Sequence, residues 1–227
     1  MVRLRPLETD LVCDPGSRSA AHPCFFAASV AMHRAVRVYL VRHGETEWSL
    51  SGRHTGRTDI RLTPHGEDEA RALGQQLRGV RFARVLASPL QRARRTAELA
   101  GLNLPAEVEP DLAEWDYGDH EGRTPAEIRG THPTWGIFRD GAPNGETPAQ
   151  MSRRVDRVIA RLRELGGDIA VFTHGHVGRA LAVRWIGLAL AEARHFSLAT
   201  ASLSVLTHDP RHDATPVIAL WNRARSI

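Results

Sequence analysis

Hydrophobic and polar positions change their period repeatedly from residue 36 onward, and each change marks a new element. The β-branched run at 36–41 predicts a buried strand that ends in a turn. Residues 63–77 then place an apolar side chain every three or four positions, after the pair Thr63-Pro64. This pattern predicts a helix with Thr as its N-cap and Pro at its first position. A short apolar run at 82–87 predicts a second strand.

Three further helices are expected to begin at a Ser or Thr that is followed by Pro and, at the third position, by Glu or Gln. This is the pattern of a capping box, and it occurs at Ser88, Thr124 and Thr147. The helix after Thr147 has the longest apolar stripe and should stop at Gly166-Gly167. The apolar run at 168–173 predicts another strand, and closing strands are expected at 201–207 and 216–221.

Alternating strands and helices predict an α/β fold. We expect a three-layer α/β/α sandwich with a mainly parallel central sheet. Residues 1–35 lack a sustained period, so we expect a disordered N-terminal extension there and one folded domain at 36–227. Met32 lies just before the first strand, and a mis-assigned start is therefore an alternative for this extension. A signal peptide fits less well, because the acidic residues Glu8 and Asp10 precede the short apolar stretch.

The amino-acid composition limits the classes of function that the chain can have. The chain has 227 residues, of which 42% are hydrophobic, enough for one core, and no apolar run approaches the roughly 20 residues that span a bilayer. All 30 residues counted as Lys or Arg are arginine, which excludes a Schiff-base lysine and a P-loop lysine. The arginines alternate with acidic residues, so we expect neither nucleic acid nor a membrane as a partner. Both cysteines, Cys13 and Cys24, precede the predicted domain, and we expect a cytoplasmic protein.

Two predicted strands end in histidine. Arg42-His43 follows the first strand, and His174 follows the strand at 168–173. In open α/β sheets, ligands bind at the carboxyl ends of the strands. Arginine binds phosphate oxygens through paired hydrogen bonds, and histidine can attack phosphorus or carry a proton. The sequence therefore predicts a phosphate site at this edge of the sheet.

Phosphoryl transfer also needs further positive charge and an acid for the leaving oxygen. Arg92 lies near the start of the helix expected after Ser88, where a helix N-terminus favours anions. Glu114 is the candidate acid, since the flanking Trp115 and Tyr117 would shield it from water and favour its protonated form. The sequence thus offers one candidate for each requirement.

A zinc site is the alternative interpretation of the histidines. His174 and His176 have a spacing found among metal ligands. Alternate residues at a strand end that then turns need not converge, and no third ligand lies nearby in the sequence. We therefore expect no metal and no cofactor.

Four separated motifs resemble those of the histidine phosphatase superfamily, also called phosphoglycerate mutase-like. They are Leu40–Thr46, Ser88–Ala93, the segment from Glu114 and Thr173–His176. The resemblance covers about residues 36–225 and implies the phosphoglycerate mutase-like fold. It also implies that His43 is phosphorylated and that Glu114 is the proton donor.

The resemblance further implies a set of side chains that hold the phosphoryl group: Arg42, Arg92 and His174. Ser49, Thr55 and Gly56 align with a loop that lines the same pocket. Many members of the family have Asn where this chain has Ser49, which is a departure from the pattern.

The short segment from Glu114 to Gly122 is similar to that of acid phosphatase-like and sedoheptulose-bisphosphatase-like members. Cofactor-dependent mutases have a longer insertion with lysine contacts, and this chain has no lysine. We therefore expect a metal-independent phosphoric monoester hydrolase that acts on small phosphorylated metabolites, sugar phosphates among them, through a phosphohistidine. Mutase-type transfer and a catalytically silent phospho-ligand module are the alternatives, and a homodimer is the default expectation for assembly.

Overall fold

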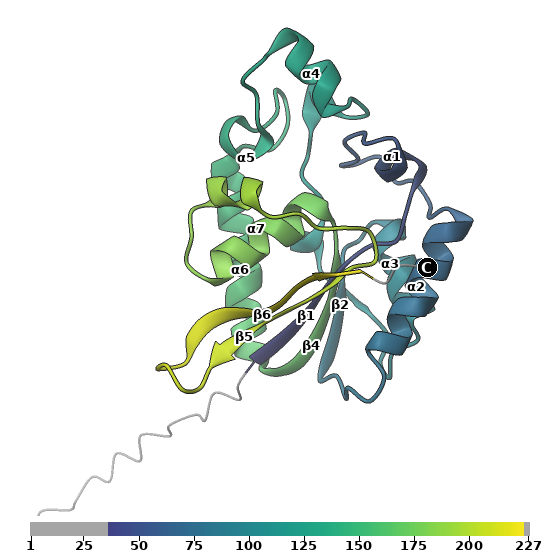
Figure 1. Ribbon diagram of the computed structural model, residues 1–227, viewed down its shortest axis with the longest axis vertical. Coiled ribbons are helices and arrows are strands. Elements are labelled where there is room, and N and C mark those ends of the chain that lie inside the picture. Colours follow the sequence, from purple (N-terminus) through teal and green to yellow (C-terminus); the bar gives the residue numbers. More distant parts are fainter. Residues whose placement is uncertain (1–35, 225–227) are drawn as a thin grey trace, which may run out of the picture. The chain divides into compact units, whose positions relative to one another are not determined.

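A computed structural model describes residues 36–224, and the expected extension at 1–35 lies outside the described residues. A six-stranded sheet with the order β3-β2-β4-β1-β5-β6 forms the centre of this part of the chain (Figure 1). Its strands are β1 (Val36–Arg42), β2 (Arg84–Ala87), β3 (Glu107–Val108), β4 (Gly167–Thr173), β5 (Leu203–Asp209) and β6 (Thr215–Arg223). The first four run parallel to one another, whereas β5 and β6 are antiparallel to their neighbours.

The register of the sheet brings three strand ends to one edge. Arg42 at the end of β1 pairs with Thr173 at the end of β4, and Ala87 at the end of β2 pairs with Phe172. The residues that follow these strands are His43, His174 and Ser88, and they therefore lie at the same carboxyl edge. Strand pairing alone thus brings together motifs more than 80 residues apart.

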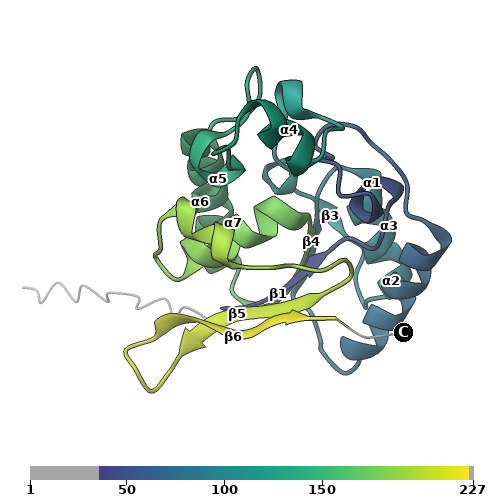
Figure 2. The same cartoon turned by 45° about the horizontal axis from the view of Figure 1, so that its top comes forward.

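Helices cover both faces of the sheet. They are α1 (Glu47–Leu50), α2 (Pro64–Gln76), α3 (Gln91–Ala100), α4 (Pro125–Thr131), α5 (Ile137–Asp140), α6 (Pro148–Leu165) and α7 (Gly175–Trp185), with 3-10 turns η1 (Pro110–Leu112), η2 (Gly118–His120) and η3 (Leu190–His195). Helices α2 and α3 lie on one side of the sheet, and α6 and α7 lie on the other (Figures 1 and 2). The expected three-layer sandwich with a mainly parallel sheet is confirmed. Among these helices, none is both long enough and apolar enough to cross a bilayer.

Side-chain alternation along the strands explains the two layers. Leu40 and Val171 point to one face and belong to the core that α6 and α7 cover. Their neighbours Val41 and Phe172 belong to a second core against α2 and α3, which includes Leu73. Successive strand side chains face opposite sides of a sheet, so strands that are buried on both faces are apolar at nearly every position.

Three of the four predicted helix starts are confirmed, and one is wrong. Thr63, Thr124 and Thr147 each cap a helix that has Pro in its first turn. The helix expected from Ser88 begins only at Gln91, and its N-cap is Leu90, which makes no side-chain capping bond. The Ser88 hydroxyl accepts the Leu90 N–H at 3.2 Å, just before the helix, and also contacts His174 Nε2 at 2.7 Å.

Candidate active site

A cavity of about 270 Å³ opens at the carboxyl edge of the sheet. Five of the predicted site residues line it, namely Arg42, His43, Ser49, Thr55 and Glu114. The lining also includes residues that were not singled out from the sequence as site residues, among them His54, Tyr117, His176 and Arg179. The predicted residues Arg92, His174 and Gly56 are not part of the lining.

His43 lies at the wall of the cavity, 5% exposed. Its Nδ1 is 2.7 Å from the carbonyl oxygen of Gly44, and because a carbonyl can only accept, Nδ1 carries the hydrogen. The lone pair is then on Nε2. Burial, followed by the nearby charges of Arg92 and Arg42, lowers the pKa of His43 well below its usual range. The ring is therefore neutral at neutral pH, which is the form that can act as a nucleophile.

The turn that carries His43 packs tightly against the start of α2. A Cβ atom on Gly44 would lie 2.3 Å from the carbonyl oxygen of Gly66. The Gly44 N–H donates to the Thr96 hydroxyl of α3 at 3.0 Å. Only glycine allows this approach, and the contact holds the backbone on which the His43 ring stands.

Arg42 presents free donors beside His43. Its Nη1 donates to the carbonyl oxygen of Leu198 at 2.5 Å. Its Nε is buried and has no hydrogen-bond partner among the described residues. Burial lowers the pKa of Arg42 from its usual value, opposed by the negative charge of Glu114. A buried, incompletely paired guanidinium in a cavity wall is suited to bind an anion.

Arg92 and His174 lie behind His43 and are fully buried. The Arg92 Nε donates to His174 Nδ1 at 3.1 Å, so His174 carries its hydrogen on Nε2, which contacts the Ser88 hydroxyl at 2.7 Å. The centroids of the His43 and His174 rings are 5.2 Å apart. Burial, together with Arg92, lowers the pKa of His174 well below its usual range. Both ring nitrogens of His174 therefore already have protein partners.

The remaining donors of Arg92 bind a loop. Its Nη groups donate to the carbonyl oxygens of Thr58, Thr55 and Gly56 at 2.8–3.1 Å. The Gly56 N–H in turn donates to the Glu121 carboxylate at 2.9 and 3.0 Å. Gly56 is thus a backbone contact for Arg92 rather than a lining residue, whereas Thr55 lines the cavity.

Ser49 lines the cavity, but its hydroxyl is engaged in capping α1. Thr46 N–H donates to the Ser49 hydroxyl at 2.8 Å, and Ser49 N–H donates to the Thr46 hydroxyl at 3.1 Å. The pair forms the capping box of this four-residue helix. A hydrogen bond from Ser49 to a ligand would compete with this cap.

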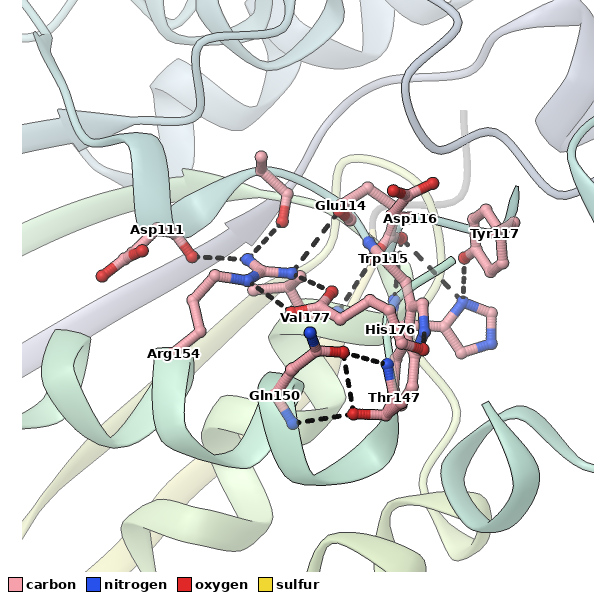
Figure 3. Close-up of polar contacts among 12 residues, drawn as sticks. Asp111, Glu114, Trp115, Asp116, Tyr117, Thr147, Gln150, Arg154, His176 and Val177 are labelled. Atoms are coloured by element: carbon pink, nitrogen blue, oxygen red, sulfur yellow. Dashed lines mark hydrogen bonds and ion pairs between the residues drawn. The ribbon is translucent and has the colours of Figure 1, made fainter. Parts of the chain in front are cut away.

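Glu114 accepts three backbone hydrogen bonds at the start of α7 (Figure 3). The donors are the N–H groups of Trp115, His176 and Val177, at 2.8–3.1 Å. A methyl group on Gly175 would lie 3.6 Å from the guanidinium carbon of Arg42 and 3.8 Å from Glu114 Oε2. The carboxyl group and the guanidinium therefore meet at one point of the cavity wall.

Arg154 of α6 fixes the chain that leads to Glu114 (Figure 3). Its Nε and Nη2 bind the Glu146 carboxylate at 2.9 and 2.7 Å, and the pair is largely buried. Its Nη1 donates to the carbonyl oxygens of Asp111 and Ala113 at 2.6 and 2.7 Å. The sequence did not reveal this role, because an arginine on an amphipathic helix is usually exposed to solvent.

Aromatic rings form the part of the wall beside Glu114, and His176 Nδ1 lies 3.9 Å from Glu114 Oε2. The Tyr117 hydroxyl lies 2.5 Å from His176 Nδ1, and the His54 ring stacks on Tyr117 with the centroids 4.5 Å apart. Burial lowers the pKa of His54 to about 4. His174 and His176 thus have separate partners. Within residues 36–224, no group of three or more potential ligands could hold a metal ion.

Residues 38–223 match the model of the histidine phosphatase superfamily, branch 1. The chain belongs to the histidine phosphatase superfamily. The match spans all four motifs on which the expected resemblance was based.

Two curated relatives of this histidine phosphatase are phosphatases by name. An acid phosphatase of Mycobacterium tuberculosis is 43% identical over 173 residues, 74% of this chain and 85% of that protein. A sedoheptulose 1,7-bisphosphatase of Saccharomyces cerevisiae is 40% identical over 184 residues, 67% of this chain and 68% of that protein. The predicted family and the predicted class, phosphomonoester hydrolase, are confirmed.

A solved structure also supports the fold of this histidine phosphatase. It is the product of an open reading frame of Mycobacterium tuberculosis, with a TM-score of 0.78 and 38% identity. The alignment covers 83% of this chain and 98% of that one. The phosphoglycerate mutase-like fold is therefore confirmed, whereas the roles of individual residues stay predictions.

Proposed function

We propose that this histidine phosphatase hydrolyses small phosphomonoesters through a phosphohistidine on His43. The observation that carries the proposal is the state of the His43 ring. Its Nδ1–H is bound to Gly44, its Nε2 lone pair is available at the cavity wall, and its pKa is well below the usual range. A neutral imidazole with a fixed orientation is what in-line attack on phosphorus requires.

In the first step, His43 Nε2 forms a bond to phosphorus while the bond to the leaving oxygen breaks. Glu114, which must be protonated for this step, gives its proton to that oxygen. In the second step, Glu114 takes a proton from water, the water oxygen attacks phosphorus, and the N–P bond breaks to release phosphate. Acid–base assistance of this kind contributes about 10²–10⁴-fold.

Arg42 is the direct phosphate ligand in this proposal, because it lines the cavity and only its Nη1 has a hydrogen-bond partner among the described residues. Arg92 and His174 act on the reaction through His43, by positive charge and by packing behind its ring. A phosphate oxygen that binds either side chain directly must replace one of their present partners, such as Ser88 on His174 Nε2. Exchange of one hydrogen bond for a charge-assisted one is favourable.

The proposed substrate is a small phosphorylated metabolite, such as a sugar phosphate. A cavity of about 270 Å³ accommodates a molecule of that size. The name of the yeast relative, a sedoheptulose bisphosphatase, supports this class of substrate. We also propose a cytoplasmic location, which agrees with a domain whose residues 36–227 include no cysteine.

The experiment compares wild type with His43→Asn in hydrolysis of p-nitrophenyl phosphate, with and without a chelator. We expect His43→Asn to lose at least about 10³-fold in kcat, as nucleophile variants of hydrolases do. His132→Asn is the matched control, since His132 is exposed and lies outside the four motifs. Rapid acid-labile labelling of wild type, but not of His43→Asn, would identify the intermediate. Full activity in His43→Asn, or loss of wild-type activity in chelator, would contradict the mechanism.

The mutase alternative predicts a different product. A mutase would interconvert 2- and 3-phosphoglycerate faster than it releases inorganic phosphate. We expect release of phosphate to dominate.

A further inference from the structure

Arg179 is a second arginine on the cavity wall that the proposed reaction does not use. It lies on α7 four residues after Gly175, the point at which Arg42 and Glu114 meet. Residues four apart share one face of a helix, and they are about 6 Å apart along its axis. Arg179 therefore lines the same cavity, about one helical turn from the point where Arg42 and Glu114 meet.

The guanidinium of Arg179 is held in place by neutral groups. Its Nε and Nη2 both donate to the carbonyl oxygen of Ala193, at 3.0 and 2.9 Å, and its CZ lies 4.6 Å from the centroid of the Phe138 ring. Its Nη1 has no hydrogen-bond partner among the described residues. No carboxylate of residues 36–224 lies within ion-pair distance of it.

Two other partly buried arginines of the domain are each paired with a carboxylate. Arg184, five residues further along α7, binds the Asp156 carboxylate through two bonds of 2.9 Å. Arg154 binds Glu146 in the same bidentate way. Arg179 thus bears a fixed, partly buried positive charge and, unlike Arg184 and Arg154, has no carboxylate within ion-pair distance among the described residues.

The cavity as a whole is short of negative charge. Arg42, Arg53 and Arg179 line it, and Glu114 is the one carboxylate among its lining residues. Burial lowers the pKa of Arg179, the negative charge of Glu114 opposes this shift, and the positive charge of Arg42 adds to it. A scissile phosphate would neutralise the Arg42 side of the cavity and leave the Arg179 side uncompensated.

We infer that Arg179 binds a second anionic group of the substrate, a carboxylate or another phosphate located several bonds from the scissile phosphate. The inference rests on the proposed phosphatase function and narrows its substrate class. The pre-positioned Nη1 donor would bind the anion at little cost in side-chain entropy, because Ala193 and Phe138 already fix the guanidinium. Arg179 is therefore a specificity-determining residue.

The test compares substrates that differ in one anionic group. Glycerol 3-phosphate and 3-phosphoglycerate share the scissile group, and the second has a carboxylate where the first has a hydroxymethyl group. Fructose 6-phosphate and fructose 1,6-bisphosphate form the second pair. Wild type should show the higher kcat/KM for the more anionic member of at least one pair, and the pair concerned distinguishes a carboxylate from a phosphate.

Arg179→Gln should lower that preference at least about 10-fold, mainly through KM, since a charge-assisted hydrogen bond contributes about 1.5–3 kcal/mol. Arg184→Gln, on the same helix but paired outside the cavity, should leave the preference unchanged.

An equal loss on both members of a pair would show a purely structural role and overturn the inference, as would absence of any wild-type preference. If wild type hydrolyses p-nitrophenyl phosphate but shows no preference, this inference fails alone; if it hydrolyses no phosphomonoester, the proposed function fails with it.

Discussion

Replacing His54 by Phe should make the folded state less sensitive to acid. His54 is 6% exposed and stacks on Tyr117, and its Nε2 is buried without a hydrogen-bond partner among the described residues. Burial, followed by the positive charges of His120 and Arg129, lowers the pKa of His54 to about 4. Phe keeps an aromatic ring against Tyr117 and removes the titrating group.

The magnitude follows from the difference between the two pKa values. The unfolded chain binds a proton on His54 near pH 6.5, whereas the folded chain binds it only near pH 4. The unfolded state therefore binds more protons in this window, and stability falls as the pH falls from 6.5 to 4. Each pH unit costs about 1.4 kcal/mol, so the free energy of unfolding should fall by about 2 kcal/mol between pH 6.5 and 5 and about 3 kcal/mol in all.

The assay is urea unfolding at pH 7.5 and pH 5.0. Wild type should lose about 2 kcal/mol more than His54→Phe between these values, and His132→Phe, a change at an exposed histidine, should behave like wild type. Buried His43 and His174 also make the folded state less stable in acid. Both are present in every variant, so their contributions cancel in the comparison. Equal losses in wild type and His54→Phe would refute the reasoning.

Three further changes test the supports of the site. Arg154→Leu leaves the Glu146 carboxylate buried and unpaired, so the free energy of unfolding in urea should fall by about 3–5 kcal/mol. The added change Glu146→Leu should restore part of it, and a loss below about 1 kcal/mol in Arg154→Leu would contradict this. Ser88→Ala removes the partner of His174 Nε2, so the free energy of unfolding should fall by about 1–3 kcal/mol and kcat for p-nitrophenyl phosphate should also fall. Unchanged stability and kcat would count against the contact. Gly175→Ala has room for its methyl group, so the melting temperature should stay constant. The methyl group lies near both Arg42 and Glu114, so kcat/KM should fall about 10-fold. Unchanged kcat/KM would place the reacting phosphate elsewhere.

Patterns among residues close together in the sequence were sufficient to predict most helices and strands of the fold. Thr63, Thr124 and Thr147 begin helices because their capping contacts lie within three residues. The strand-end positions of His43 and His174 follow from apolar runs that stop at a turn. Parallel strands then bring both residues to one edge of the sheet, so the sequence could predict their proximity.

The same local rule was wrong at Ser88. Its pattern matches the other three helix starts, but its hydroxyl contacts His174, which is 86 residues away. The hydroxyl also accepts the Leu90 N–H, one residue before α3 begins. No local window of the sequence contains the contact with His174. Local reasoning also could not separate Arg42, which faces the cavity, from Arg92, which lies fully buried behind it.

The sequence by itself determined the layered fold, the family and the residue types at the strand ends. Tertiary structure alone decided which of those side chains present free atoms to the cavity. It also assigned Arg154 to the chain before Glu114 and left Arg179 without a counter-ion. The physical reason is that secondary structure depends on contacts a few residues apart, whereas the pairing and burial of a charge depend on segments that meet only when the sheet and its two helical layers have formed.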